Sequence, residues 1–156
     1  MRRVLQVIGI ILVIGFVVLQ FFQPGKNSGP PSGDDLFAAR QVPDDVQQIL
    51  RNSCYDCHSN QTRYLWYHRI SPVSWMVNHH IEEGKHELNL SEWGRLDLYD
   101  QITILEEMAQ EAKRKTMPLK SYLIMHPDAK LNAQQIETIE KWSSDLGEEL
   151  LKKGAK

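Results

Sequence analysis

The sequence contains little cysteine: only Cys54 and Cys57 among 156 residues. A structural zinc site normally joins two ligand pairs of short spacing. The nearest second pair here is His79 and His80, with no further cysteine. Neither the alternating apolar pattern of strands nor an internal repeat of solenoid length is present, so sheet and repeat architectures are not expected. Any cysteine-dependent site must therefore use Cys54 and Cys57 as its one cysteine pair.

The sequence also has no excess of positive charge. Removing Arg2 and Arg3 from the 18 Lys and Arg side chains leaves 16, against 20 Asp and Glu. This mildly acidic balance argues against nucleic acid as a partner.

The two cysteines stand in the pentad Cys54-Tyr55-Asp56-Cys57-His58. C-x-x-C-H is the pattern of covalent haem attachment. On a helical turn, positions i, i+3 and i+4 share one face, so two thiols that can add to the haem vinyl groups and one imidazole that can ligate iron point the same way. The pentad predicts one covalently bound haem c with His58 as the proximal iron ligand.

Other uses of a C-x-x-C pair stay open. The pair could be half of a zinc site, a disulfide in an oxidising compartment or a redox-active dithiol. A thioredoxin-like dithiol opens a helix after a strand, whereas this pair closes an expected helix. We therefore favour haem attachment.

An apolar run over residues 4–22 follows the N-terminal arginines. At about 1.5 Å per residue it is roughly 28 Å long, close to the thickness of a bilayer core. The positive-inside rule keeps Arg2 and Arg3 in the cytoplasm, which predicts a single-pass inner-membrane protein with its haem domain in the periplasm. A cleaved signal peptide is the alternative, although no A-x-A-like site follows the run.

Three segments are expected along the chain. Residues 1–22 form the transmembrane anchor or signal peptide, and residues 23–35, rich in Pro, Gly and Ser, form a flexible linker. Residues 36–156 form the haem-binding domain, which has the size of one ordinary domain.

Four helices are expected in that domain. The first covers residues 43–54, and the second begins with Ser71 as N-cap and Pro72 at the first helical position and ends near Gly84 as the C′ residue. The third covers residues 98–115. The fourth begins at Asn132, with Gln135 completing a capping box. Residues 116–131, which contain two prolines, are expected to be a loop.

The sixth iron ligand separates electron transfer from ligand binding. Met117 is the first candidate because Pro118 disfavours helical backbone before it, which frees a flexible thioether to reach a cofactor. One of His79 or His80 is the second candidate, and Met125, His126 or an empty site remain. The other side chains considered are expected to be core (Met76, Met108), solvated (His68, His86), surface or propionate-binding (Arg63, Arg69), or pocket lining and core (Trp66, Trp75, Trp93, Tyr122).

Four blocks of the sequence, residues 53–60, 72–75, 89–93 and 117–122, resemble the bacterial haem-binding domain family, which has a cytochrome-c-like pattern. The order of pentad, Met-Pro loop and terminal amphipathic helix also resembles small mono-haem cytochromes c. The resemblance implies an all-α, cytochrome-c-like domain of about four helices around one haem, held by Cys54, Cys57 and His58.

The function expected from these features is that of a membrane-tethered one-electron carrier outside the cytoplasm, with His58 proximal and Met117 distal. Its redox donor and acceptor proteins are unidentified. The alternative is a haem-based sensor or small-ligand-binding domain with an open or displaceable sixth site. An enzyme is not expected, because a peroxidase needs acid–base groups above an open distal face and the sequence identifies no such pair.

Overall fold

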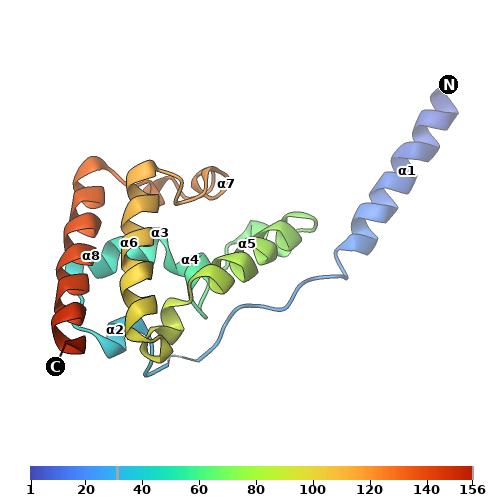
Figure 1. Ribbon diagram of the computed structural model, residues 1–156. Helices are drawn as coiled ribbons and strands as arrows, with labels where there is room; N and C mark the ends of the chain where they lie inside the picture. The colour runs from blue at the N-terminus through green and yellow to red at the C-terminus, as the bar shows by residue number, and fades with distance from the viewer. Residues whose placement is uncertain (31, 156) are drawn as a thin grey trace.

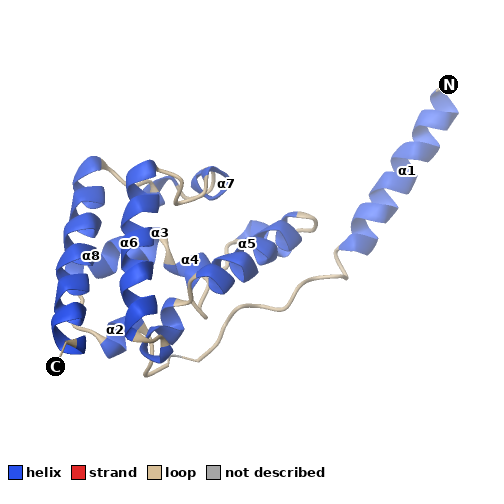
Figure 2. Ribbon diagram, viewed as in Figure 1, coloured by secondary structure: helices blue, strands red, loops and turns tan. Residues whose placement is uncertain are grey.

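The computed structural model describes residues 1–30 and 32–155, and within these residues the regular structure is helical (Figure 2). A single isolated antiparallel bridge, Ser28 with Gln61, is the only β feature of the described chain. The all-α expectation is confirmed. Pro31 of the expected linker and Lys156 of the expected domain lie outside the described residues. The elements in chain order are α1 (Arg2–Leu19), α2 (Leu36–Ala39), α3 (Asp44–Ser53), α4 (Tyr55–His58), η1 (Trp66–Arg69), α5 (Val73–Glu87), η2 (Leu90–Arg95), α6 (Leu98–Arg114), α7 (Lys120–Leu123), η3 (Pro127–Ala129) and α8 (Ala133–Gly154).

The core lies where α6, α8 and α3 pack together. Helices α6 and α8 run side by side in opposite directions, and α3 crosses near them (Figure 1). Leu50, Leu105 and Trp142 belong to one buried cluster that also includes the fully buried Trp93 of η2. Each apolar stripe recurs at helical spacing, so burying it stabilises the helix that carries it.

The expected third and fourth helices are confirmed. Helix α6 ends at Arg114, and Lys115 follows in the left-handed region at φ 57° as its C-cap. At the start of α8, Oδ1 of Asn132 accepts from the Gln135 backbone N–H at 2.9 Å. The Gln135 side chain accepts from the Asn132 N–H at 3.0 Å, which completes the capping box.

The segment between α6 and α8 was expected to be a loop and contains two short helical turns, α7 and η3. The backbone N–H groups of Tyr122 and Leu123 both bond to the carbonyl of Leu119. Pro118 lies before α7 and Pro127 lies after it, so the prolines keep α7 from extending into a longer helix at either end.

The first expected helix, residues 43–54, is confirmed as α3, which has Pro43 and Cys54 as its cap residues. Helix α3 ends at Ser53, and Cys54 leaves helical geometry at φ −126° and ψ −44° before the short α4 begins. The carbonyl of Cys54 accepts from the N–H groups of Cys57 at 3.2 Å and His58 at 2.9 Å. These bonds retain the i, i+3, i+4 turn that the spacing predicted.

Both predicted ends of the second helix are wrong. Helix α5 begins at Val73 with Pro72 as its cap residue, and Ser71 makes no capping bond. The Ser71 hydroxyl instead accepts from Gln23 at 2.9 Å and lies 3.1 Å from the Ser74 hydroxyl. At the other end, α5 continues through Gly84 to Glu87.

Helix α1 extends away from the rest of the chain, with no buried residue (Figure 1). Among the described residues it is the one helix with the length and mean hydropathy, 2.2, that crossing a membrane requires. In the expected linker that follows, residues 23–30 and 32–35 are not helical. Its Asn27 side chain donates to the Ser59 carbonyl at 2.7 Å and to the Thr62 hydroxyl at 2.9 Å, so this part of it rests on the loop after the pentad.

Candidate functional site

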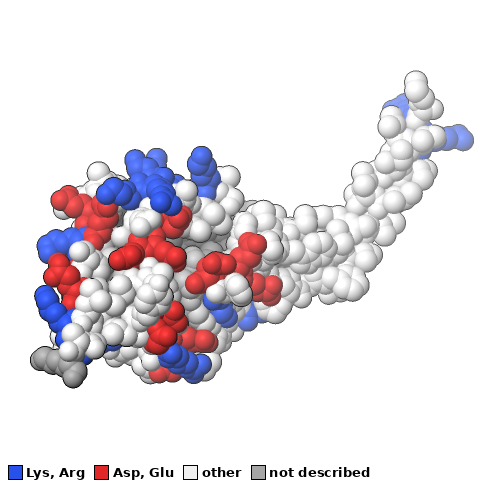
Figure 3. All heavy atoms as spheres, viewed as in Figure 1, with Lys and Arg blue, Asp and Glu red and all other residues white. Residues whose placement is uncertain are grey.

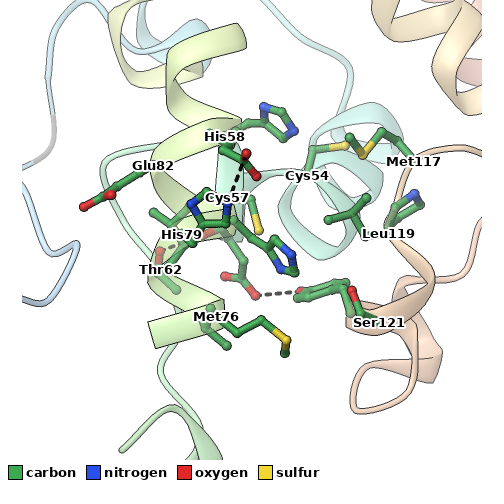
Figure 4. Close-up of a pocket in the computed structure, with 18 of the residues that line it drawn as sticks. Cys54, Cys57, His58, Thr62, Met76, His79, Glu82, Met117, Leu119 and Ser121 are labelled. Atoms are coloured by element: carbon green, nitrogen blue, oxygen red, sulfur yellow. Dashed lines mark hydrogen bonds and ion pairs between the residues drawn. The ribbon is translucent and has the colours of Figure 1, made fainter. Parts of the chain in front are cut away.

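A cavity of about 810 Å³ lies beside the pentad (Figure 4). Its walls come from α4, from η1, from the whole length of α5 and from residues 117–125. This volume falls within the range of pockets that enclose organic ligands, about 300–1,000 Å³. The side chains of Cys54, Cys57 and His58, from the pentad, and of Met117, from a distant part of the sequence, all line it.

His58 is held in one tautomer. Its Nδ1 lies 3.2 Å from the carbonyl oxygen of Leu88, which can only accept a hydrogen bond. Nδ1 therefore carries the proton and Nε2 keeps its lone pair, which is the state that ligates a metal. Burial lowers the pKa of His58, although hydrogen bonds to backbone oppose the shift, so the neutral ring predominates at neutral pH.

The two thiols are held in their neutral form. Burial, with the neighbouring Cys57 as a smaller cause, raises the pKa of Cys54 to about 12. Burial and the charge of Asp56 raise the pKa of Cys57 to about 11. Zinc coordination and dithiol exchange both require thiolates. Within residues 1–30 and 32–155, no three His, Cys, Asp or Glu side chains converge in a metal-binding group.

Gly84 brings α5 onto the pentad. A Cβ at this position would lie 2.9 Å from the Cys57 carbonyl oxygen, closer than side chains tolerate, and 3.2 Å from the Cys57 Cβ, which is also a tight contact. The missing side chain lets the α5 backbone pass directly against α4. The glycine that was expected to end the helix thus serves as a close contact in its interior.

A buried carboxylate inside the pentad binds side chains from two other segments of the chain. Asp56 is 6% exposed. It accepts from the Arg63 backbone N–H at 3.0 Å and from the Arg63 guanidinium at 3.1–3.3 Å. It also accepts from the Tyr122 hydroxyl at 2.7 Å. The Arg63 guanidinium bonds to Asp56 through Nε and Nη2, and its side chain is 53% exposed, in agreement with the expected surface position. Residue types alone gave no signal for this network beyond an acid placed between two cysteines.

The sulfur-bearing side chains around the cavity differ from expectation in one case. Met117 lines the cavity and is 37% exposed, and Met125 also lines it. Met108 packs against the main core, as expected. Met76 was expected in the core, but it is 47% exposed and lines the cavity (Figure 4). The predicted apolar face of α5 therefore borders the cavity. In the sequence, the spacing of its apolar residues is the same as that of a helix face packed against a core.

The histidines separate by environment. His79 is exposed, pairs with Glu83 at 3.1 Å and, like the half-buried His80, lines the cavity. His86 is exposed, as expected. His68 was expected to be solvated and is buried, with Nδ1 accepting from the Leu65 N–H at 2.8 Å.

His126 is buried outside the cavity lining. Its Nε2 lies 2.6 Å from the Tyr67 hydroxyl, and its ring stacks on Tyr122 at 4.0 Å between ring centres. These contacts place His126 behind the cavity wall that Tyr67 and Tyr122 form.

The tryptophans do not share one role. Trp93 is fully buried in the core, as expected. Trp66 and Trp75 were expected in the pocket or core, yet they are 69% and 39% exposed and line no part of the cavity. Arg69 is exposed on η1.

The side chains present fit a covalently attached haem. Two neutral thiols and an imidazole with a free Nε2 lie on one wall, and Gly84 removes the side chain that would obstruct that wall. Apolar side chains and methionine thioethers line much of the remainder. Hydrophobic walls with a few placed donors are what a porphyrin requires.

One comparison with known proteins gives a match. A model of the family described as haem-binding domain matches residues 14–145, which include the pentad, α5 and the 117–125 segment. No curated protein and no solved structure matches the chain at a significant level.

Proposed function

The chain belongs to the haem-binding domain family, and on that premise we propose that it is a membrane-tethered c-type haem protein that carries single electrons outside the cytoplasm. One observation carries the proposal. The two thiols of the pentad and the His58 imidazole, with Nε2 unprotonated, line the same cavity.

Cys54 and Cys57 hold the cofactor. Each thiol would add across one vinyl group of the haem, with its sulfur bonding one vinyl carbon and its hydrogen passing to the other, so the addition would need no oxidant. His58 supplies the proximal nitrogen. The Leu88 carbonyl restrains the ring and increases the basicity of Nε2. When bound, haem c supplies a ferric/ferrous one-electron couple.

Met117 is the distal ligand in this proposal. It lines the same cavity as the pentad, and Tyr122, a few residues further along the same segment, is bonded to Asp56 of the pentad. A thioether ligand favours the ferrous state relative to a second imidazole. If His58 and Met117 both held the iron, the site would exchange electrons without binding a substrate, which suits a carrier.

Helix α1 is the membrane anchor in this proposal, and the haem domain lies in the periplasm. The helix is 18 residues long, begins with Arg2 and Arg3 and is otherwise largely apolar. Tethering raises the effective concentration of the domain towards redox donor and acceptor proteins in the same membrane.

The proposal is tested by replacing both thiols. The full chain should show covalent haem staining after denaturing electrophoresis, and Cys54→Ala with Cys57→Ala should abolish it. Ser144→Ala, at an exposed position of α8, serves as the control. Absorption and resonance Raman spectra should show a low-spin, six-coordinate iron in both oxidation states. Stoichiometric zinc without haem would refute the cofactor, and a high-spin spectrum would favour the sensor alternative.

A further inference from the structure

Exposed aromatic and aliphatic side chains lie on η1, on the neighbouring first turn of α5 and just after α1. Leu65 and Trp66, at the start of η1, are 40% and 69% exposed, and Trp75, in the first turn of α5, is 39% exposed. Phe21 and Phe22, just after α1, are 82% and 64% exposed. None of these side chains lines the cavity.

Direct hydrogen bonds connect this region to the end of α1. The Trp75 indole N–H donates to the Phe22 carbonyl at 2.7 Å. Gln20 and Ser71 form a reciprocal pair, in which the Ser71 N–H donates to the Gln20 side chain at 2.9 Å and that side chain donates to the Ser71 carbonyl at 3.2 Å. The start of α5 is thereby held at the level where the apolar helix ends.

The charge distribution sets this region apart. The chain has 20 acidic side chains, and none lies within residues 1–33 or 57–81. The cationic residues of the second stretch are Arg63 and Arg69. In Figure 3 the acidic and basic side chains cover the part of the domain away from α1, while the part next to α1 shows almost none in that view.

We propose that the surface formed by Leu65, Trp66, Arg69 and Trp75, termed the η1 surface, docks on the lipid interface of the membrane that α1 spans. Tryptophan is favoured at the headgroup level because its ring is apolar and its N–H is polar. Arginine pairs with anionic headgroups there. Carboxylates, which anionic headgroups would repel, are absent from residues 57–81. The occupant is lipid because the surface continues directly from the end of α1.

This inference rests on the proposed anchor and gives the site an orientation. Helix α5 carries Trp75 at its start and lines the cavity from Val73 to Glu87. Along the helix axis, Glu87 lies about 18 Å from Trp75. Docking would therefore hold the cavity close to the membrane surface, within reach of membrane-embedded redox partners.

Photo-crosslinking of the full chain in nanodiscs of phosphatidylethanolamine and phosphatidylglycerol tests the proposal. Benzoylphenylalanine replaces Trp66 in one variant, Val13 of α1 in a second and Tyr99 of α6 in a third. Tyr99 is 77% exposed and belongs to α6, a helix that lies away from α1 (Figure 1). Mass spectrometry should detect lipid adducts at positions 66 and 13 and none above background at position 99.

The other outcomes separate the possible failures. Lipid adducts at position 13 without adducts at position 66 would refute docking and leave the anchor standing. Chain-to-chain adducts at position 66 would assign the η1 surface to a second copy. Absence of lipid adducts at both positions would refute the anchor and the docking together.

Discussion

The Tyr122 hydroxyl donates a hydrogen bond of 2.7 Å to Oδ2 of Asp56 and so joins α7 to the pentad helix α4. Burial raises the pKa of Tyr122, and the hydrogen bond to Asp56 raises it further, so the hydroxyl remains a donor at neutral pH. The bond links the thiol-bearing wall of the cavity to the segment that carries Met117.

Tyr122→Phe should therefore destabilise the protein. The variant loses one hydrogen bond to a buried carboxylate, which is worth about 1.5–3 kcal/mol of unfolding free energy. Denaturant unfolding of the haem-loaded full chain measures the loss. Tyr99→Phe, at an exposed position, should leave the midpoint unchanged. Equal stability of the two variants would show that the contact with Asp56 contributes nothing.

Gly84→Ala should separate α5 from α4. The added Cβ meets backbone atoms of Cys57, which cannot rotate away, so we expect a loss of about 1–3 kcal/mol and less covalently attached haem. Gly147→Ala, on α8 where a Cβ meets nothing within 4 Å, is the matched control and should be neutral or stabilising. Haem content per chain and thermal unfolding measure both effects. Full haem loading and unchanged stability in Gly84→Ala would contradict the close approach.

Met117→Ala should leave covalent haem intact and open the sixth position. We expect loss of the weak red thioether-to-ferric charge-transfer band, a lower reduction potential and carbon monoxide binding to the ferrous protein. Met117→His should restore a six-coordinate low-spin site at a lower potential. Met108→Leu, in the core, is the control. If the sixth ligand persists in Met117→Ala, the ligand is His79, His80 or Met125, and the carrier role still stands.

Stability should fall as the pH drops below about 6.5. Burial lowers the pKa of both His68 and His126 in the folded chain. The charge of His126 lowers the pKa of His68 further, and the charge of Asp56 opposes the shift at both histidines. The unfolded chain, with ordinary histidine pKa values near 6.5, then binds more protons than the folded chain, so acid favours unfolding. Denaturant midpoints at pH 7.5 and 5.5 should differ less in His126→Gln than in the unmutated protein. An equal difference would exclude His126 as a contributor.

Membrane topology gives a fifth prediction. Protease added to intact spheroplasts should remove the haem domain, because Arg2 and Arg3 hold the other end of α1 in the cytoplasm. Inside-out vesicles are the control and should protect the domain. A mature N-terminus located after Phe22 would replace the anchor by a cleaved signal peptide and leave the haem argument intact.

Local patterns were sufficient for much of the architecture. The capping box at Asn132 and the apolar stripes of α6 and α8 were predicted because caps and helical periodicity depend on residues within a few positions of one another. The family resemblance was readable for the same reason: its distinctive blocks are short and contiguous, and the family match now covers them.

The sequence by itself determined that one cysteine pair and one histidine share a turn, and that an apolar helix precedes an all-α domain. Only the tertiary structure decided what lies against that turn. Gly84, Met76 and His68 were misplaced because their environments depend on chain segments that local spacing does not encode. An apolar helix face has the same periodicity whether it borders a core or a cavity, and a glycine has the same identity at a helix end or at a close contact. Packing between distant segments distinguishes these cases.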